Sequence, residues 1–268
     1  MLLREVEYAR PASVQEALRF LGANDGARAL AGGQTLINVM KARAASPDVL
    51  VDLADIGELR GIELGADGTL ELGAMTTYTD IIESAEARAR PILGEVCNQI
   101  ADVQVRNRGT VGGNVCSNDP TNHLPPLLVA IGAAMTIVGR DGERSVPAEE
   151  FFLGVYMTAV GPGELLTKIS VPPGKSDGFA SVPIGRDGTC IVNVAASLDG
   201  GGARLAVGCV DAVPILLAAD STEDAVVRKV VQAASLDPPW DVHASVDYRR
   251  HLAEVLAVRA VAQATGRK

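Results

Sequence analysis

Two glycine-rich segments constrain the fold of this chain more than any other feature of its sequence. The first, residues 30–37 (LAGGQTLI), lies between a short strand-like run and a helical stretch, and the second spans residues 106–114 (RNRGTVGGN). Because glycine has no Cβ, a ligand can approach the backbone closely, and successive amides near a helix start can point toward one anion. Gln34, Thr35, Thr110 and Asn114 add neutral side-chain donors. Together the segments predict a pyrophosphate-like ligand, although either one alone also fits a simple tight turn.

The periodicity of apolar residues predicts an α+β protein in three parts. Residues 1–55 are expected to form a small αβ layer and residues 56–174 a second αβ subdomain. Residues 175–268 are expected to form a smaller α+β domain, with a linker at 172–178 (PPGKSDG). We therefore place the main boundary near residue 175.

Local signals predict the individual elements. Ser13 and Glu16 form the capping-box pattern S-x-x-E at a helix start, and Thr77 or Thr79 is expected to cap another helix. The turns at 66–68 and 199–202 predict two β-hairpins. Further helices are expected at 36–43, 91–101, 222–234 and 247–265, strands at 27–30, 49–53 and 165–171, and an apolar stretch at 127–138.

Composition excludes several classes of protein. The net charge of −9 offers no basic surface for nucleic acid, and the 3% aromatic content leaves no stacking platform for single strands. No apolar run reaches the roughly 20 residues of a membrane span, and the N-terminus lacks a signal-peptide core, so a cytoplasmic protein is expected. The four cysteines are too scattered for an iron–sulfur cluster or another metal site, and we expect them to be buried, reduced thiols.

No residue pattern indicates acid–base or nucleophilic catalysis. The serines lack the G-x-S-x-G context, and the histidines are isolated. No G-x-G-x-x-G supports a Rossmann site, and the sequence 174–176 (GKS) lacks the earlier glycine of a phosphate-binding loop, where Ile169 stands instead. We therefore predict neither catalytic residues nor metal ligands in this chain.

The two glycine segments together resemble a known family. AGGQT with the following LINVMKAR, and RNRGTVGGN with the following NDPTNHLPP, are similar to the flavoprotein subunits of molybdenum hydroxylases. This family includes the medium subunit of aerobic carbon monoxide dehydrogenase and the FAD domain of xanthine dehydrogenase. The later F-x-x-G-x-Y (151–156) and Glu164-Leu165-Leu166 also match, and the resemblance covers nearly the whole chain. It implies two αβ subdomains of the vanillyl-alcohol-oxidase-like (PCMH-type) FAD-binding fold, plus a small C-terminal domain with a three-stranded sheet and helices.

The resemblance also implies which residues touch FAD. The first segment would wrap the pyrophosphate, and the second would lie near the phosphates and the flavin. Two apolar positions would add contacts, one of them near the ring. The implied cofactor contacts are Leu30, Ala31, Gly32, Gly33, Gln34, Thr35, Leu36, Ile37, Ile100, Thr110, Val111, Gly112, Gly113, Asn114, Asp119, His123 and Val160.

Two positions depart from the family pattern. His123 stands where the family has an aspartate that contacts the adenosine end of FAD, and Asp119 could take over part of that contact. Val182 lies in the segment where the family often has a lysine that contacts the flavin, and Arg186 is the basic residue that persists there. These departures imply that the reduction potential of the flavin, or the electron acceptor, differs from that of other family members.

As a family member, the chain would bind FAD non-covalently and relay electrons. A large molybdopterin subunit would oxidise the substrate, and a small [2Fe-2S] subunit would pass the electrons to the flavin. NAD⁺, a quinone, oxygen or another acceptor would then receive them from the flavin. The three subunits would assemble as a dimer of heterotrimers. The alternatives are a stand-alone FAD-dependent oxidoreductase and a non-enzymatic assembly protein that has lost FAD. We also expect a bulkier residue at Gly32 or Gly112 to abolish FAD retention without unfolding the chain, because its Cβ would intrude on the phosphates.

Overall fold

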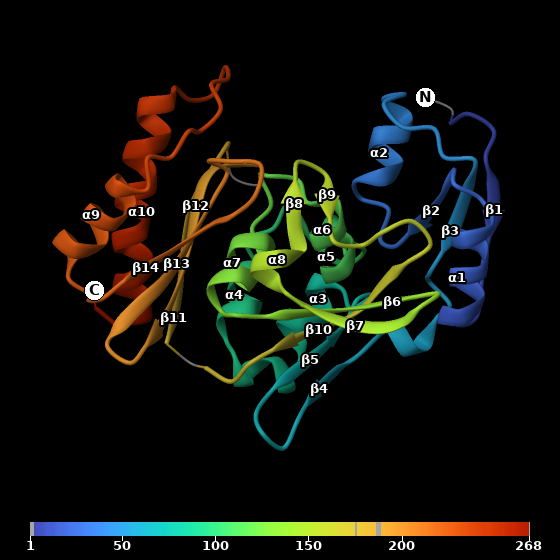
Figure 1. Cartoon of the computed structure of the whole chain (residues 1–268), viewed down its shortest axis with the longest axis horizontal. Coiled ribbons are helices and arrows are strands. Elements are labelled where there is room, and N and C mark those ends of the chain that lie inside the picture. Colours follow the sequence, from blue (N-terminus) through green and yellow to red (C-terminus); the bar gives the residue numbers. More distant parts are fainter. Residues whose placement is uncertain (1–2, 175, 186–188, 268) are drawn as a thin grey trace.

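The computed structural model describes residues 3–174, 176–185 and 189–267 and arranges them as three units in a row, each built around a β-sheet (Figure 1). The N-terminal unit (blue) and the C-terminal unit (orange and red) lie at opposite ends of the central unit. The expected α+β fold class is confirmed. The domain boundaries at residues 55 and 174 stay predictions. In the described part of the chain, no helix is long and apolar enough to cross a membrane.

Parallel strands joined by helices form the N-terminal unit, with strand order β1-β3-β2. The Ser13 hydroxyl caps α1 by accepting the Glu16 amide at 3.2 Å. The Glu16 carboxylate accepts the amide of Ala12 instead of that of Ser13, so the predicted capping box is only half formed. The elements are β1 (Glu7–Ala9), α1 (Val14–Ala23), β2 (Ala27–Leu30), α2 (Leu36–Lys41) and β3 (Val49–Asp52).

A five-stranded antiparallel sheet, with strand order β4-β5-β10-β6-β7, forms the centre of the molecule. The predicted hairpin at 66–68 is confirmed, because β4 and β5 pair across it. Thr77 caps α3 through a complete capping box with Asp80. The strands are β4 (Ile62–Leu64), β5 (Leu70–Gly73), β6 (Ala134–Gly139), β7 (Gly142–Pro147) and β10 (Leu165–Val171), with a separate hairpin of β8 (Phe152–Gly154) and β9 (Met157–Thr158).

Short helices cover this central sheet. The helix expected at 91–101 ends early, at Cys97, and Ala101 adopts a left-handed backbone with φ 44°. The apolar stretch at 127–138 is two elements, separated at Gly132 (φ 70°), where the chain leaves a helix and enters β6. The helical segments are η1 (Gly57–Leu59), α3 (Tyr78–Glu83), η2 (Glu86–Ala89), α4 (Ile92–Cys97), α5 (Val103–Arg106), α6 (Val111–Ser117), α7 (Leu124–Ala130) and α8 (Ala148–Phe151).

The C-terminal unit contains a four-stranded antiparallel sheet, one strand more than expected. Neither edge strand, β11 or β14, was among the strands located from the sequence; β14 pairs with β13 at one edge of the sheet. It follows Pro214 and is only five residues long, so its sequence carries little periodicity to distinguish it from a loop. The elements are β11 (Asp177–Pro183), β12 (Cys190–Asp199), β13 (Gly202–Gly208), β14 (Ile215–Ala219), α9 (Asp224–Ala233) and α10 (Val246–Ala264).

The C-terminal sheet is covered on one face by α9 and α10 and on the other by the central unit, as the residues of β12 show. Val192, Val194 and Ala196 point to the apolar cluster formed with α9 and α10. Ala195, between them, belongs to the cluster of the central unit. Because alternate residues of a strand face opposite sides, a strand buried on both faces reads as a continuous apolar run.

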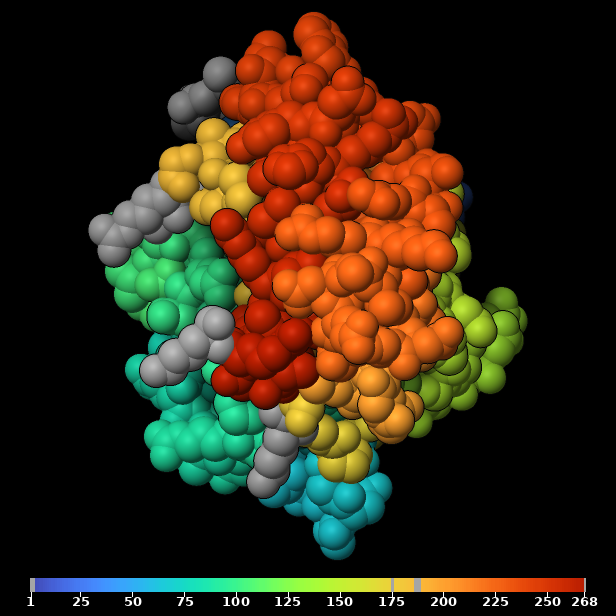
Figure 2. All heavy atoms as spheres, turned by 90° about the vertical axis from the view of Figure 1, so that its left-hand side faces the viewer, coloured from blue at the N-terminus to red at the C-terminus, as the bar shows by residue number. Residues whose placement is uncertain are grey.

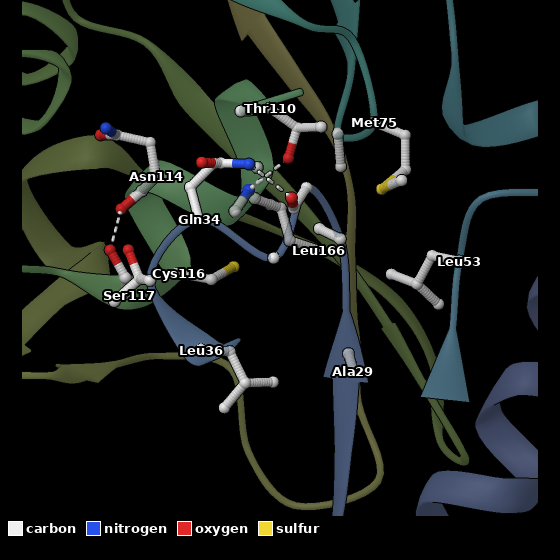
Figure 3. A pocket seen from close by; sticks show the side chains of 18 of the residues that line it. Ala29, Gln34, Leu36, Leu53, Met75, Thr110, Asn114, Cys116, Ser117 and Leu166 are labelled. Atoms are coloured by element: carbon white, nitrogen blue, oxygen red, sulfur yellow. Dashed lines mark hydrogen bonds between the residues drawn. The ribbon is translucent and has the colours of Figure 1, made fainter. Parts of the chain in front are cut away.

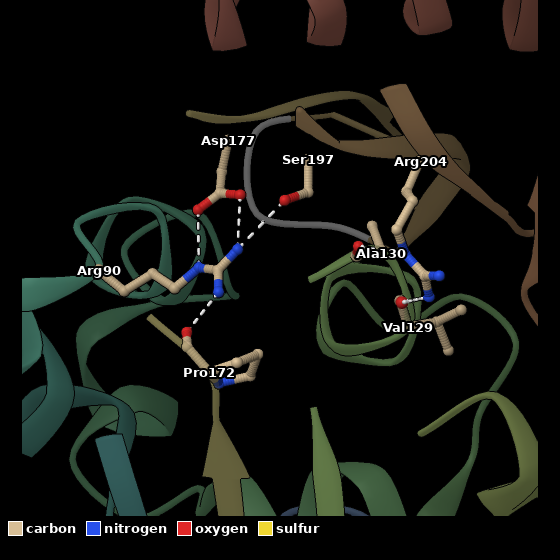
Figure 4. Close-up of polar contacts among 7 residues, drawn as sticks. All are labelled: Arg90, Val129, Ala130, Pro172, Asp177, Ser197 and Arg204. Carbon is tan, nitrogen blue, oxygen red and sulfur yellow. Dashed lines mark hydrogen bonds and ion pairs between the residues drawn. The ribbon is translucent and has the colours of Figure 1, made fainter. Parts of the chain in front are cut away.

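Arginine side chains join the central and C-terminal units (Figure 4). Arg90 makes a two-pronged ion pair with Asp177, with both N–O distances 2.8 Å, and also donates to the carbonyl of Pro172 and the hydroxyl of Ser197. Arg204 of β13 donates to carbonyls at the end of α7. Figure 2 faces this end of the molecule and shows the C-terminal unit (orange and red) in front, with parts of the central unit (green and cyan) visible beside and below it.

The predicted linker at 172–178 is therefore wrong at its C-terminal end. Asp177 and Gly178 belong to β11, and a Cβ at Gly178 would lie 1.9 Å from the carbonyl oxygen of Ala260. The residue Lys175 lies outside the described part of the chain. The segment leaves the central unit and enters the C-terminal sheet within a few residues.

Candidate functional site

A cavity of about 470 Å³ opens between the N-terminal and central units (Figure 3). The turn between β2 and α2 borders it on one side, and the start of α6 borders it on the other. Tyr156 and Val160, which flank β9, and Leu165 and Leu166 of β10 complete the wall. Its size is that of a small-molecule or cofactor pocket.

The first glycine segment forms the β2–α2 turn. Gly33 has φ 72°, a conformation that favours glycine, and it allows the chain to turn from the strand into α2. The Gln34 amide donates to the Gly32 carbonyl at 3.1 Å, which holds this side chain over the turn. Thr35 stands at the N-cap position of α2 but makes no side-chain capping bond. Its hydroxyl is therefore not used to cap the helix.

The second glycine segment connects α5 to α6 and is held to the central unit. The Thr110 hydroxyl accepts the Gly113 amide at 3.1 Å and so caps α6. The amide of Val111 donates to the carbonyl of Thr76, and the amide of Gly112 donates to that of Ala74, both at 2.9 Å. These bonds fix the start of α6 against the segment that precedes α3.

The two glycine segments touch each other. A Cβ added at Gly32 would lie 2.0 Å from the carbonyl oxygen of Arg108, and one at Gly112 would lie 2.6 Å from that of Ala74. A side chain at either glycine would therefore collide with protein backbone. We expected a Cβ at Gly32 or Gly112 to meet the phosphates of FAD and to leave the fold intact. This reason is wrong, because the Cβ would meet the backbone of the protein itself.

The cavity brings together most of the sequence-predicted contacts from both segments. Leu30, Ile37 and Val111 belong to the same segments but do not line it, and Val111 is buried in the core of the central unit. Ile100, which is partly buried, packs on that core. The predicted residues that line the cavity are Ala31, Gly32, Gly33, Gln34, Thr35, Leu36, Thr110, Gly112, Gly113, Asn114 and Val160.

Asp119 and His123 do not line the cavity. Asp119 accepts a hydrogen bond from the hydroxyl of Tyr156, which does line it, at 3.1 Å. His123 is buried at the start of α7, where its ring stacks on Phe179 with 5.5 Å between ring centroids. The expected adenosine contact thus lies in the junction with the C-terminal unit.

Val182, at the start of the segment where the resemblance implied a basic flavin contact, also does not line the cavity. Val182 is in β11 and packs at the edge of the C-terminal core. Arg186 lies outside the described part of the chain.

The remaining wall residues were missed by sequence reasoning. Gly109 stands inside the second motif, and Tyr78 follows the predicted cap Thr77, so both had a local signal. Val39 lies on α2, and Cys116 and Ser117 lie on α6, the helices that begin in the two glycine segments. Tyr156, Glu164, Leu165 and Leu166 belong to the later family match at 151–156 and 164–166. The others come from strands and loops that only the tertiary structure gathers. The missed residues are Arg28, Ala29, Val39, Leu53, Ala74, Met75, Tyr78, Gly109, Cys116, Ser117, Tyr156, Glu164, Leu165 and Leu166.

The titratable groups on the wall are poorly suited to proton transfer near neutral pH. Burial raises the pKa of Tyr78 well above its usual value, and burial raises that of Cys116 to about 12. The Glu164 carboxylate is held by Arg144 at 2.6 and 2.9 Å and by the Gly161 amide at 2.7 Å. A general base needs a pKa near the working pH and a free lone pair. The wall therefore suits binding better than acid–base catalysis.

One polar pair on the wall is buried. The Asn114 side-chain amide donates to the Tyr78 hydroxyl at 2.9 Å, and Asn114 Oδ1 has no hydrogen-bond partner. Buried polar atoms are normally paired, so an unpaired one beside a cavity is consistent with a bound group that changes this hydrogen bonding. Among the described residues, no group of three or more histidine, cysteine or acidic side chains could hold a metal ion.

Comparisons with known proteins agree with this geometry. Residues 4–174 match the family model described as "FAD binding domain in molybdopterin dehydrogenase". The carbon monoxide dehydrogenase medium chain of Afipia carboxidovorans is 37% identical, over 100% of this chain and 99% of that relative. The glyceraldehyde dehydrogenase medium chain of Sulfolobus acidocaldarius is 34% identical, over 96% of this chain and 97% of that relative.

The likeness extends to the fold. A chain of the reconstituted CO dehydrogenase from Oligotropha carboxidovorans superposes with a TM-score of 0.93 at 34% identity, with full coverage of both chains. The resemblance first drawn from the two glycine segments is confirmed.

Proposed function

The chain belongs to the family of FAD-binding domains of molybdopterin dehydrogenases, and from this membership we propose that it binds FAD in the cavity and transfers electrons within a larger molybdenum-containing enzyme. Its relatives are dehydrogenase subunits, so the chain is an oxidoreductase component. The observation that carries the proposal is the meeting of the two glycine segments at one cavity, although they are far apart in sequence.

The residues present fit FAD. Gly33, Gly112 and Gly113 line the cavity, and the absence of a Cβ at Gly112 and Gly113 lets the start of α6 lie close to Ala74 and Ala31 beside it. Gln34 and Thr35 offer neutral donors on the same side. A pyrophosphate is an anion that accepts hydrogen bonds, which matches a wall of amides and hydroxyls without carboxylates at that end.

An apolar wall continues from the glycine segments. Leu53, Met75 and Leu166 line the cavity, and Figure 3 shows them around the space beside the first turn. Such side chains exclude water and can contact a flat ring system. When bound, FAD supplies the electron-transfer chemistry, because its ring exchanges one or two electrons. The chain's own role is then to bind the cofactor, to orient it and to shield it from water.

The finer proposal concerns partners. The relatives are named medium chains, which is the name of one subunit among several. We infer a large molybdopterin subunit that oxidises the substrate and a small [2Fe-2S] subunit that delivers electrons to this chain, assembled as a dimer of heterotrimers in the cytoplasm. The final acceptor would be NAD⁺, a quinone, oxygen or another oxidant.

Co-purification tests both parts of the proposal. The tagged full chain, isolated from its native cells, should carry one FAD and bring down a larger molybdenum-containing chain and a smaller iron–sulfur chain. Absorption spectroscopy, metal analysis and mass spectrometry measure these. No flavin absorption, even after addition of FAD, would overturn the cofactor assignment. Oxidation of an organic substrate by the isolated flavin-loaded chain would instead support a stand-alone oxidoreductase.

A further inference from the structure

A cluster of sulfur and nitrogen groups lies in the junction between α7 and the C-terminal sheet, apart from the cavity. Cys190, the first residue of β12, places its Sγ 3.8 Å from Nε2 of His123. Cys209 follows β13 directly and contributes a second thiol, which interacts with that of Cys190. All three side chains are buried. The proposed electron transfer uses none of them.

The backbone brings the two cysteines together from the ends of neighbouring strands. Asn193 pairs with Gly208 in the β12–β13 ladder, so Cys209 lies just beyond the last pair. Its φ of 67° turns the chain out of the ladder at that point. A Cβ at Gly208 would lie 2.2 Å from Oδ1 of Asn193, which shows how closely the strand end packs on β12.

We propose that Cys190 and Cys209 form an oxidisable dithiol that closes into a disulfide between β12 and the end of β13. This site is independent of the FAD cavity. The hydrogen bond from Cys190 to the Val192 carbonyl and the contact with His123 fix the position of its sulfur, and Cys209 lines a small crevice together with Asp119 and Asp211.

The four thiols differ in their readiness to react. The interaction with Cys209 and the neighbouring His123 lower the pKa of Cys190, which favours its thiolate over that of the other cysteines. The interaction with Cys190 raises the pKa of Cys209. Burial raises the pKa of Cys97 and of Cys116 to about 12, which keeps both as thiols. Because the thiolate is the reactive form, Cys190 is the expected point of attack.

Hydrogen peroxide can serve as the oxidant. The Cys190 thiolate attacks one peroxide oxygen, the O–O bond breaks, and hydroxide leaves with the formation of a sulfenic acid. The Cys209 sulfur then displaces the sulfenic oxygen, the S–S bond forms, and the oxygen leaves as water with the Cys209 proton. The two thiols lose two electrons in total, and peroxide is reduced to water.

Peptide mapping of the full chain tests the proposal. Arg204 lies between the two cysteines, so trypsin places them on separate peptides unless a disulfide joins them. After peroxide treatment, denaturation and alkylation, we expect a linked Cys190–Cys209 peptide, while Cys97 and Cys116 are recovered alkylated. Dithiothreitol should release the linked peptides.

Single variants identify the order of the steps. Cys209→Ser should trap the sulfenic acid on Cys190, detectable with dimedone, and Cys190→Ser should leave Cys209 unoxidised. Cys97→Ser is the matched control and should still give the linked peptide. Absence of that peptide from the peroxide-treated wild-type chain, or equal oxidation of all four thiols, would overturn the proposal even if a variant fails to fold.

Discussion

Individual glycines decide how closely the two glycine segments approach each other and the strand end at Ala74. Gly32 lies against the backbone of Arg108, and Gly112 lies against that of Ala74. Sequence reasoning assigned both glycines to the cofactor because a glycine is known to admit a ligand. Here the missing Cβ makes room for another stretch of the same chain, which in turn shapes the cavity. The same residue type therefore serves the fold and the site at once.

Gly32→Ala is expected to lower both stability and flavin content. A Cβ 2.0 Å from a carbonyl oxygen forces the two segments apart, and overpacking of this kind costs about 1–3 kcal/mol. Thermal unfolding, followed with the flavin absorption of the same sample, measures both effects. Gly22→Ala is the matched control, because a Cβ there meets nothing within 4 Å. Wild-type stability in Gly32→Ala would contradict this account.

Cys116 is expected to report on occupancy of the cavity. Its sulfur points into the space near Gln34 and Leu36 (Figure 3), and burial raises its pKa to about 12. Alkylation by iodoacetamide should therefore be slow at pH 8 and should accelerate as the pH rises toward 10, since only the thiolate reacts. Added FAD should protect this residue. Equal alkylation with and without FAD in a chain that binds it would contradict the placement.

At the scale of elements, Arg90 joins the central unit to the C-terminal sheet. The pair with Asp177 leaves the side chains only 4% and 3% exposed, and the remaining donors reach Pro172 and Ser197. A guanidinium has five donors in a fixed plane, so one side chain can bridge a helix, a loop and two strands. A charge buried in this way is stable only while all its partners are present.

Arg90→Met is expected to destabilise the protein by about 3–5 kcal/mol, because it leaves Asp177 buried without its partner. Arg10→Met is the control, since the Arg10–Asp55 pair is about half exposed and should be worth at most about 1 kcal/mol. Urea unfolding of both variants measures the difference. Similar losses in the two variants would show that the buried pair contributes no more than a surface one.

At the scale of the whole molecule, the three units share their cores. The apolar cluster of the central unit includes Phe179, Ala195 and Ala206 from the C-terminal sheet. That of the N-terminal unit includes Met75 and Leu165 from the central one. Each unit thus has its own sheet, but its apolar core is completed by residues of a neighbouring unit. The family model ends at residue 174, within this shared structure.

A chain truncated after residue 174 is expected to be insoluble or only partly folded. The truncation exposes the apolar surface of α7, whose residues are all buried in the full chain, and it removes the partner of Arg90. Soluble yield, circular dichroism and thermal unfolding measure the effect. A cooperative unfolding transition at the wild-type temperature would show that the first 174 residues form an independent domain.

The sequence by itself determined the family, the α+β class and the two glycine segments. It also located most helices and strands, because capping residues such as Thr77 and hairpin turns such as 66–68 act through neighbouring residues. These signals are local, so a single sequence carries them. The short edge strand β14 and the early end of α4 escaped, since each depends on what packs beside it.

Only the tertiary structure decided how the cavity is closed and what lies outside it. Leu53, Met75 and Leu166 come from separate elements, and no spacing in the sequence links them. His123 lies against Phe179 and Cys190 because α7 packs on the C-terminal sheet, a contact between residues far apart in the chain. The local sequence determines the local backbone conformation. Burial and side-chain partners depend on long-range packing, which also brings together the wall of this cavity.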